Sequence, residues 1–343
     1  MDMTDLTSPI NETDRPINLE DIFQDNIRNI QVFSDSENIR FFFFGCWNDN
    51  RDATRDIVNN INSLENESKC LFGLVCGDNV YPQKESGNKI ADINHIIEGF
   101  NILKNFDGLV YIGLGNHEVD TTEKCKALLD EKRNSTNNIV MPNNYYSIDV
   151  IHNSNQKLIT KIIMLDTNLL EGNTCYGKHN DIIEEEMMRW LNNELMICKN
   201  QSITPIVAGH YPLFYFKENK NNKQYTFTVN VIMTRIYEML YDYQHPIQYI
   251  CADIHNYQYI TTNNITQHIV GTGGAQQDKI VTVDIPFMME NTQNIYNIIK
   301  CEQKYGYLYV DVDSSITTGD FREIPREPIV KQKKDKTKKD LQD

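Results

Sequence analysis

Residues 70–81 read CLFGLVCGDNVY, an apolar run followed at once by glycine, aspartate and asparagine. The near-continuous apolar run at the start predicts a strand that is covered on both faces. Gly77 and Asn79 are turn residues, so the chain is expected to leave the strand sharply at Asp78. The pattern therefore predicts a carboxylate that is held rigidly at the end of a buried strand.

Four other segments share this arrangement, in which side chains able to bind metal follow an apolar run. They are GCWND (45–49), GNHE (115–118), AGHYP (208–212) and ADIHNYQ (252–258). A single segment of this kind means little. Five of them in this order form a set that a purely structural scaffold has no reason to maintain.

The apolar runs also predict the fold. Buried strands are expected at residues 39–44, 70–76, 109–112, 159–165, 203–208, 247–251 and 307–312. Helical patterns lie between them, and the clearest is 181–198, where Met187 and Trp190 are expected to be core residues. Strand, polar loop and helix repeat, which predicts an α/β fold with its site at the carboxyl ends of the strands.

The polar side chains in these loops suit a pair of metal ions. Hydrolysis of a phosphate ester needs an oxygen nucleophile and neutralisation of the phosphoryl charge, and two ions about 3.5–4 Å apart supply both. Asp78 is the candidate for the carboxylate that touches both ions. Asn116 offers an amide oxygen, His210 and His255 offer imidazoles, and Asp253 offers a second carboxylate.

His117 follows Asn116 directly and is not itself needed as a ligand. A histidine beside a phosphate site serves well as a general acid or a phosphate contact. The alternative is an ordinary loop histidine with a local hydrogen bond. We predict the functional role.

At these residues the chain resembles the calcineurin-like metallophosphoesterases, and more closely their purple acid phosphatase branch. That family reads GD, GDNxY, GNH[DE], GHYP and GHDHNxQ in this order, and the resemblance runs from about residue 40 to residue 312. It implies a four-layer α/β/β/α sandwich with two mixed β-sheets, and hydrolysis of phosphomonoesters by a metal-bridging hydroxide. The implied cofactors are two divalent or trivalent ions of iron, zinc or manganese.

Carried over by position, the resemblance also implies the ligands of each ion. The first ion would take Cys46, Asp78, Tyr81 and His255. The second would take Asp78, Asn116, His210 and Asp253.

Three positions depart from the family pattern. Cys46 stands where the family has aspartate, Asp253 where it has the first histidine of GHDH, and Asn219 where a second substrate-facing histidine is usual. A Cys46 thiolate can bind iron or zinc, but a cysteine that closes an apolar strand is often a small buried hydrophobe. In that case Asp49 is the substitute donor. Asp253 keeps an anionic donor, which predicts a retained second site with altered metal preference.

Tyr81 also has two readings. As a phenolate ligand it would stabilise a ferric ion and give a visible charge-transfer band. In isolation, a tyrosine before a proline is more often a packed aromatic with its hydroxyl at the surface. The preceding Gly-Asp-Asn favours ligation.

The chain of 343 residues is predicted to have one catalytic domain at 38–321, preceded by a lead-in at 1–37 and followed by a basic, disordered tail at 322–343. Its 33 basic and 48 acidic residues give a net charge of −15, which disfavours long nucleic acid and leaves a small phosphate ester as the expected partner. The sequence has neither a secretory signal nor a membrane-spanning apolar stretch, so an intracellular, cytoplasmic location is expected. The oligomeric state is left open.

A competing hypothesis gives the protein a non-catalytic role. The chain would be a catalytically silent descendant, kept as a phosphate-binding, interaction or structural module, with Cys46 and Asp253 as marks of decay. Against it, Asp78, Asn116 and the histidines of the motifs all remain.

Overall fold

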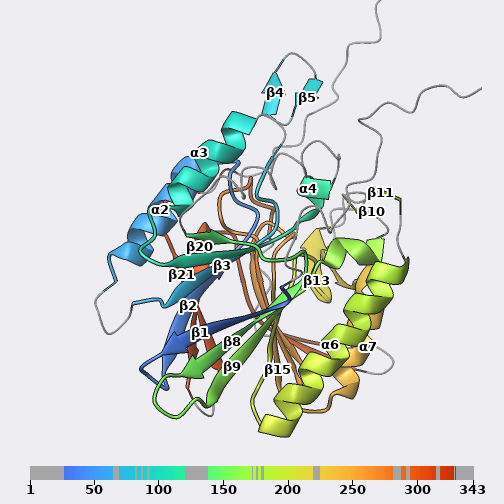
Figure 1. The fold of residues 1–343 in the computed structure, drawn as a ribbon. Helices are drawn as coiled ribbons and strands as arrows, with labels where there is room; N and C mark the ends of the chain where they lie inside the picture. Colours follow the sequence, from blue (N-terminus) through green and yellow to red (C-terminus); the bar gives the residue numbers. More distant parts are fainter. Residues whose placement is uncertain are drawn as a thin grey trace, which may run out of the picture.

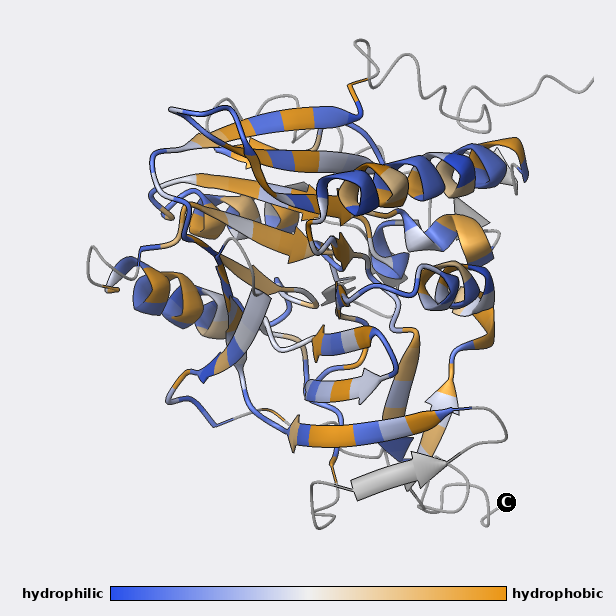
Figure 2. Cartoon of the chain, turned by 90° about the horizontal axis from the view of Figure 1, so that it is seen from below, coloured by the Kyte–Doolittle hydropathy of each residue, from blue (hydrophilic) through white to orange (hydrophobic). Residues whose placement is uncertain are grey.

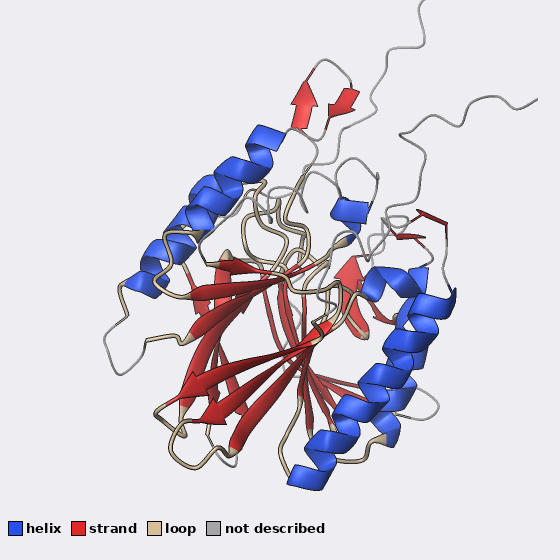
Figure 3. Ribbon diagram, in the orientation of Figure 1, coloured by secondary structure: helices blue, strands red, loops and turns tan. Residues whose placement is uncertain are grey.

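Two mixed β-sheets lie face to face, and helices cover the outer face of each (Figures 1 and 3). This computed structural model describes residues 27–64, 69–81, 83–85, 88–90, 93–119, 138–171, 173–174, 177–178, 181–218, 225–280, 287–290, 294–313, 317–327 and 329. The α/β fold with four α/β/β/α layers, predicted from the sequence, is confirmed.

The smaller sheet has six strands. Their order is β21 (Thr317–Glu323), β20 (Gly306–Val312), β2 (Ile39–Phe44), β3 (Phe72–Cys76), β6 (Leu109–Gly113) and β7 (Ile139–Val140). The last four strands are parallel to one another, whereas β20 runs antiparallel to both β2 and β21. Helices α2 (Arg51–Asn62) and α3 (Ile93–Leu103) cover its outer face.

Strand β2 shows why this sheet is buried on both sides. Its four consecutive phenylalanines are fully buried. Successive side chains point to opposite faces of a strand, so both faces of β2 are covered. Phe42 meets Phe106 edge to face, with ring centroids 4.9 Å apart, and Phe41 stacks on Phe72 at 5.2 Å. The run of aromatics thus joins the outer helical layer to the interior between the sheets.

The larger sheet has nine strands. Their order is β1 (Asn29–Ser34), β8 (Tyr146–His152), β9 (Leu158–Met164), β12 (Ile206–Ala208), β15 (Ile247–Cys251), β17 (Ile265–Val270), β16 (Tyr257–Thr262), β19 (Ile295–Glu302) and β18 (Phe287–Glu290). Helices α6 (Asp181–Gln201) and α7 (Thr234–Asp242) cover its outer face. Met187 of α6 is fully buried, which confirms it as a core residue, and the half-buried Trp190 packs against the core beside Tyr145.

Short elements complete the described chain. They are the hairpins β4 (Gln83–Glu85) with β5 (Asn88–Ile90), β10 (Asn173–Thr174) with β11 (Gly177–Lys178) and β13 (Phe214–Glu218) with β14 (Tyr225–Val229), and the turns α4 (Asn116–Val119), η3 (Thr167–Glu171) and η4 (Val231–Met233). Apolar residues gather in the strands and on one side of the flanking helices (Figure 2).

Strands β1 and β21 extend outside the segment predicted as the catalytic domain. Strand β1 lies within the segment assigned to the lead-in and pairs in parallel with β8. Strand β21 continues past residue 321, and Ile324 behind it is buried. The tail after residue 329, the lead-in before residue 27 and Asn219 lie outside the described residues.

Two smaller observations concern expectations from composition. The six cysteines among the described residues are free thiols, and all but Cys301 are buried. Within the described chain, helices that combine the length and the apolarity required to cross a bilayer are absent.

Candidate metal centre

Five strands deliver the motif residues to one place. In the smaller sheet, the parallel strands β2, β3 and β6 end just before Cys46, Asp78 and Asn116. In the larger sheet, the parallel strands β12 and β15 end just before His210 and Asp253. The carboxyl ends of the two sets meet, as the repeating strand-loop pattern predicts.

Two glycines allow these loops to touch. A Cβ on Gly77 would lie 2.4 Å from Nδ1 of His210, and Gly77 has a φ of +76°. A Cβ on Gly115 would lie 2.2 Å from the backbone nitrogen of Asp78. Any larger residue would push apart the loops that hold the site.

The residues predicted for the first ion lie together. Donor atoms of Cys46, Asp78 and His255 are within 4.8 Å of one another, and all three residues are buried. The Tyr81 hydroxyl donates a 2.9 Å hydrogen bond to Oδ2 of Asp78 and lies 3.3 Å from Nε2 of His255. Cys46 thus belongs to this cluster by position as well as by motif.

The residues predicted for the second ion surround His210. Its Nε2 lies 3.0 Å from Oδ1 of Asn116, 3.4 Å from Oδ1 of Asp78 and 3.9 Å from Oδ1 of Asp253. Asp78 therefore turns Oδ2 toward one cluster and Oδ1 toward the other. A carboxylate with its two oxygens placed in this way could contact two metal ions.

Both imidazoles are oriented by backbone carbonyl groups. Nδ1 of His210 lies 3.1 Å from the carbonyl oxygen of Cys76, and Nδ1 of His255 lies 2.9 Å from that of Gln276. A carbonyl oxygen only accepts hydrogen bonds, so each Nδ1 carries a proton and each Nε2 is the ring nitrogen that faces the cluster and can bind a metal ion. Metal-ligating histidines are fixed in this way, so the residues present fit a pair of metal ions.

Glu118 is a further residue of the site to which the sequence did not assign a role. Its buried carboxylate accepts hydrogen bonds from the backbone N–H groups of Asp78 and Val80, both at 3.1 Å, and of Gly115, at 2.5 Å. It ties the loop after β3 to the loop after β6. Burial and the Asp78 charge raise its pKa well above the ordinary value, although these hydrogen bonds oppose the rise.

The pKa values of the ligand candidates reflect their burial and the charged groups packed around them. Burial alone would raise the pKa of Asp78, but the charges of His210, His117 and His255 and the Tyr81 hydrogen bond outweigh it and hold the pKa below its ordinary value. Burial and then the Asp78 charge raise the pKa values of the Cys46 thiol and the Tyr81 phenol far above the ordinary ones. Burial also raises the pKa of Asp253. Binding of a metal ion by these groups would therefore release protons.

Three ligand candidates have a left-handed backbone. The φ angles are 51° at Cys46, 52° at Asp78 and 60° at Asp253. Few residues other than glycine adopt this region, and such outliers concentrate at functional sites.

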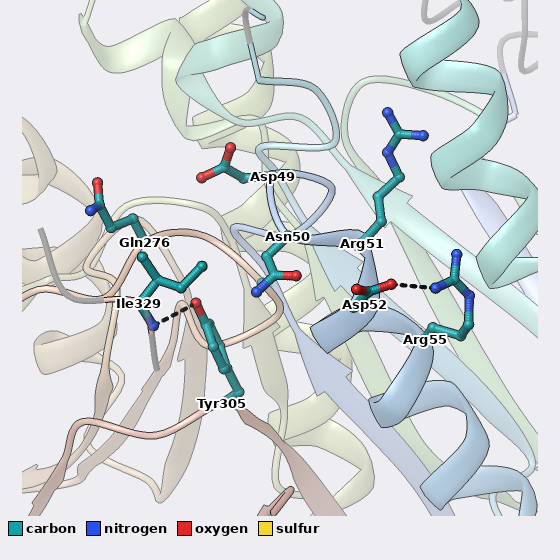
Figure 4. A pocket seen from close by; sticks show the side chains of 9 residues that line it. Asp49, Asn50, Arg51, Asp52, Arg55, Gln276, Tyr305 and Ile329 are labelled. Atoms are coloured by element: carbon teal, nitrogen blue, oxygen red, sulfur yellow. Dashed lines mark hydrogen bonds and ion pairs between the residues drawn. The ribbon is translucent and has the colours of Figure 1, made fainter. Parts of the chain in front are cut away.

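His117 and Asp49 lie beside the clusters. The backbone N–H of His117 donates to Oδ1 of Asp78 at 3.2 Å, and its half-buried ring is 4.7 Å from the ring of Tyr81. The exposed Asp49 carboxylate instead lines a neighbouring pocket of about 600 Å³ (Figure 4). This places Cys46, and not Asp49, among the donor atoms of the first cluster.

The pocket adjoins the first cluster through Gln276, whose backbone carbonyl orients His255. Arg55 and Asp52 pair on its wall at 2.5 Å, and the Tyr305 hydroxyl accepts the backbone N–H of Ile329 at 3.2 Å (Figure 4). Pockets of about 300–1,000 Å³ accommodate small organic ligands. The volume is therefore suitable for the organic part of a small substrate.

Comparisons with known proteins show the fold. Neither a family model nor a curated protein matches the chain. Among solved structures, it is similar to GAP50, the anchor in the inner membrane complex of Plasmodium, with a TM-score of 0.61 and 17% identity over 87% of this chain and 90% of that one. It is also similar to PhoD, with a TM-score of 0.52 and 12% identity over 85% of this chain and 67% of that one. The fold is a metallophosphoesterase-like sandwich.

Proposed function

We propose that this protein is a binuclear metal-dependent phosphoesterase that hydrolyses small phosphomonoesters. The position of Asp78 carries the proposal, because its two oxygens face two separate groups of donor atoms. The carbonyl-oriented imidazoles of His210 and His255 support it independently.

Cys46, Asp78, Tyr81 and His255 would hold one ion, and Asp78, Asn116, His210 and Asp253 the other. A thiolate, imidazoles and a phenolate favour zinc or iron over magnesium or calcium, and manganese is the third candidate. When bound, such a pair acidifies water and neutralises charge on the phosphoryl group.

The chain's own residues bind the ester and supply a proton. The half-buried Asn116 amide can donate to a phosphoryl oxygen, and it is held by its contact with His210. His117 is held beside Asp78 by its backbone N–H, and its imidazole would protonate the departing alcohol. The pocket beside Gln276 would receive that alcohol.

A second candidate is the non-catalytic module. It draws support from the similar fold of GAP50, which is described as an anchor, and from the raised pKa of the buried Cys46 thiol, which disfavours the thiolate until a metal ion binds. The two candidates differ in metal content and in turnover.

The test combines these two measurements. We expect protein reconstituted with zinc, iron or manganese to hold two ions per chain and to hydrolyse an aryl phosphate. Asp78→Ala should reduce the rate at least about 1,000-fold, because both ions lose a ligand. Asp107→Ala is the control and should keep most of the activity, because Asp107 is an exposed aspartate that pairs with Lys69 and does not line the pocket. A chain that binds no metal after reconstitution, or an Asp78→Ala variant as fast as the parent, would exclude the enzyme.

A further inference from the structure

Strand β13 is held against the larger sheet by two buried glutamines. Gln258 of β16 accepts the backbone N–H of Phe216 at 2.9 Å and donates to its carbonyl at 2.8 Å. Gln267 of β17 accepts the N–H of Leu213 at 2.8 Å and donates to the carbonyl of Phe214 at 2.5 Å. Both glutamines are fully buried. A side-chain amide that satisfies both backbone groups of one residue fixes the position of that residue.

This clamp determines where Lys217 lies. Side chains alternate along a strand, and the buried Phe214 and Phe216 take one face of β13. Tyr215 and Lys217 therefore take the other face. Gln258 belongs to the ADIHNYQ segment and lies three residues after His255, so the same segment supplies a donor atom to the first cluster and the clamp for Lys217.

Lys217 reaches the rim of the metal centre. Its Nζ lies 3.5 Å from Oδ2 of Asp278, and this same oxygen accepts the backbone N–H of His255 at 3.1 Å. One carboxylate oxygen therefore separates the ammonium group from the backbone of His255, a ligand candidate of the first cluster.

Lys217 supplies positive charge beside a group of carboxylates. Asp78, Asp253 and Asp278 place negative charge around the position that a phosphate dianion must approach. The ion pair of Lys217 with Asp278 is long at 3.5 Å, and one third of the lysine side chain is exposed. Lys217 can therefore turn toward a phosphate while Asp278 keeps its hydrogen bond from the backbone N–H of His255.

We propose that Lys217 is a substrate-binding residue whose ammonium group contacts the phosphoryl oxygens, and that Gln258 positions it. The proposal rests on the proposed function, because it assigns Lys217 to the same phosphate site. Lys217 would bind the substrate but no metal ion, unlike the metal ligands that the family resemblance implies.

The test uses the metal-loaded full chain and inorganic phosphate as the probe. We expect Lys217→Gln to weaken phosphate binding, measured by isothermal titration and as a competitive inhibition constant, by about 10-fold or more, as for loss of one charge-assisted hydrogen bond. Lys217→Arg should stay within about 3-fold of the parent. Lys300→Gln is the matched control, since Lys300 is a half-exposed lysine paired with Glu302 on β19 and should bind phosphate like the parent.

Gln258→Ala tests the positioning role. It should weaken phosphate binding, and the double variant with Lys217→Gln should bind no more weakly than Lys217→Gln alone, because both act through one ammonium group. The metal content of each variant must match the parent. Additive effects would show that Gln258 acts elsewhere.

Three results would overturn the proposal. Unchanged phosphate binding in Lys217→Gln removes the contact, and a lowered metal content shows that Lys217 supports His255 through Asp278 instead. A parent that holds metal but binds no phosphate also refutes it. If the parent binds phosphate through Lys217 but hydrolyses no ester, the binding role stands and the proposed enzyme fails.

Discussion

His268 should make the folding stability of this protein depend on pH. The side chain lies on β17 and is 2% exposed, with Tyr259 stacked on it at 4.6 Å between ring centroids. The Tyr257 hydroxyl lies 3.0 Å from its Nδ1. Burial lowers the pKa of His268 from its ordinary 6.5 to about 3. Protonation would place an uncompensated charge in the interior and would turn the Nδ1 acceptor into a donor.

The sign follows from the lowered pKa. The unfolded chain takes up the proton as pH falls through 6.5, whereas the folded chain resists until about pH 3. Stability from this group is therefore full above pH 6.5 and falls by about 1.4 kcal/mol per pH unit below it. The loss amounts to about 2 kcal/mol at pH 5 and approaches about 5 kcal/mol at low pH.

Urea unfolding of the metal-free protein at pH 7.5, 6 and 5 measures this effect. His268→Gln keeps an acceptor for Tyr257 but carries no titratable proton, so it should lose about 2 kcal/mol less than the parent between pH 7.5 and 5. The comparison cancels the other titrating groups, which both proteins share. His245→Gln, at an exposed position, should follow the parent. Parallel curves for the parent and His268→Gln would refute the reasoning.

Three further predictions concern the metal centre. Cys46→Ser should lower zinc affinity in equilibrium dialysis and Cys46→Asp should restore it, since a carboxylate can replace the thiolate; equal affinity in all three proteins would make Cys46 a packed thiol. Iron-loaded protein should show a visible charge-transfer band that Tyr81→Phe removes, and a band that survives would exclude the phenolate as its source. At Asp253, whose φ is 60°, glycine should give a metal-free protein about 1 kcal/mol more stable than alanine does in urea unfolding, opposite to the usual order. An alanine variant at least as stable as the glycine variant would contradict the backbone strain inferred at Asp253.

Interior strands could be predicted from the sequence, and edge strands could not. The expected bounds of β2 and β15 match the structure, because apolar residues fill every position but one in each strand. The run at 203–208 gives a strand only from Ile206, since Pro205 has no N–H for the ladder. Strands β1 and β21 are edge strands with one exposed face, so their mixed sequences, NIQVFS and TTGDFRE, carry little apolar signal.

For the site, the motifs predicted which donors gather but not what holds them. The sequence indicated Asp78, His210 and His255, and the structure brings their donor atoms together. The roles of Glu118 and Gln258 depend on contacts with residues about 40 positions away in the chain, which no local pattern reveals. The direction of Asp49 likewise follows from positive φ angles in the loop before it, at Cys46 and Asn48.

Backbone strain at the ligand candidates bears on the choice between enzyme and silent module. At Asp78 the strain is offset by hydrogen bonds, because Glu118 accepts its N–H, and His117 and Tyr81 donate to its two oxygens. Among the described residues, the Asp253 carboxylate has its contact with Nε2 of His210. The distance of 3.9 Å is too long for a hydrogen bond. A module without metal would gain stability from glycine at this position and lose no interaction of comparable strength. The proposed metal site accounts for an aspartate at this strained position, and it predicts that the gain in stability on adding zinc is larger for the parent than for the glycine variant.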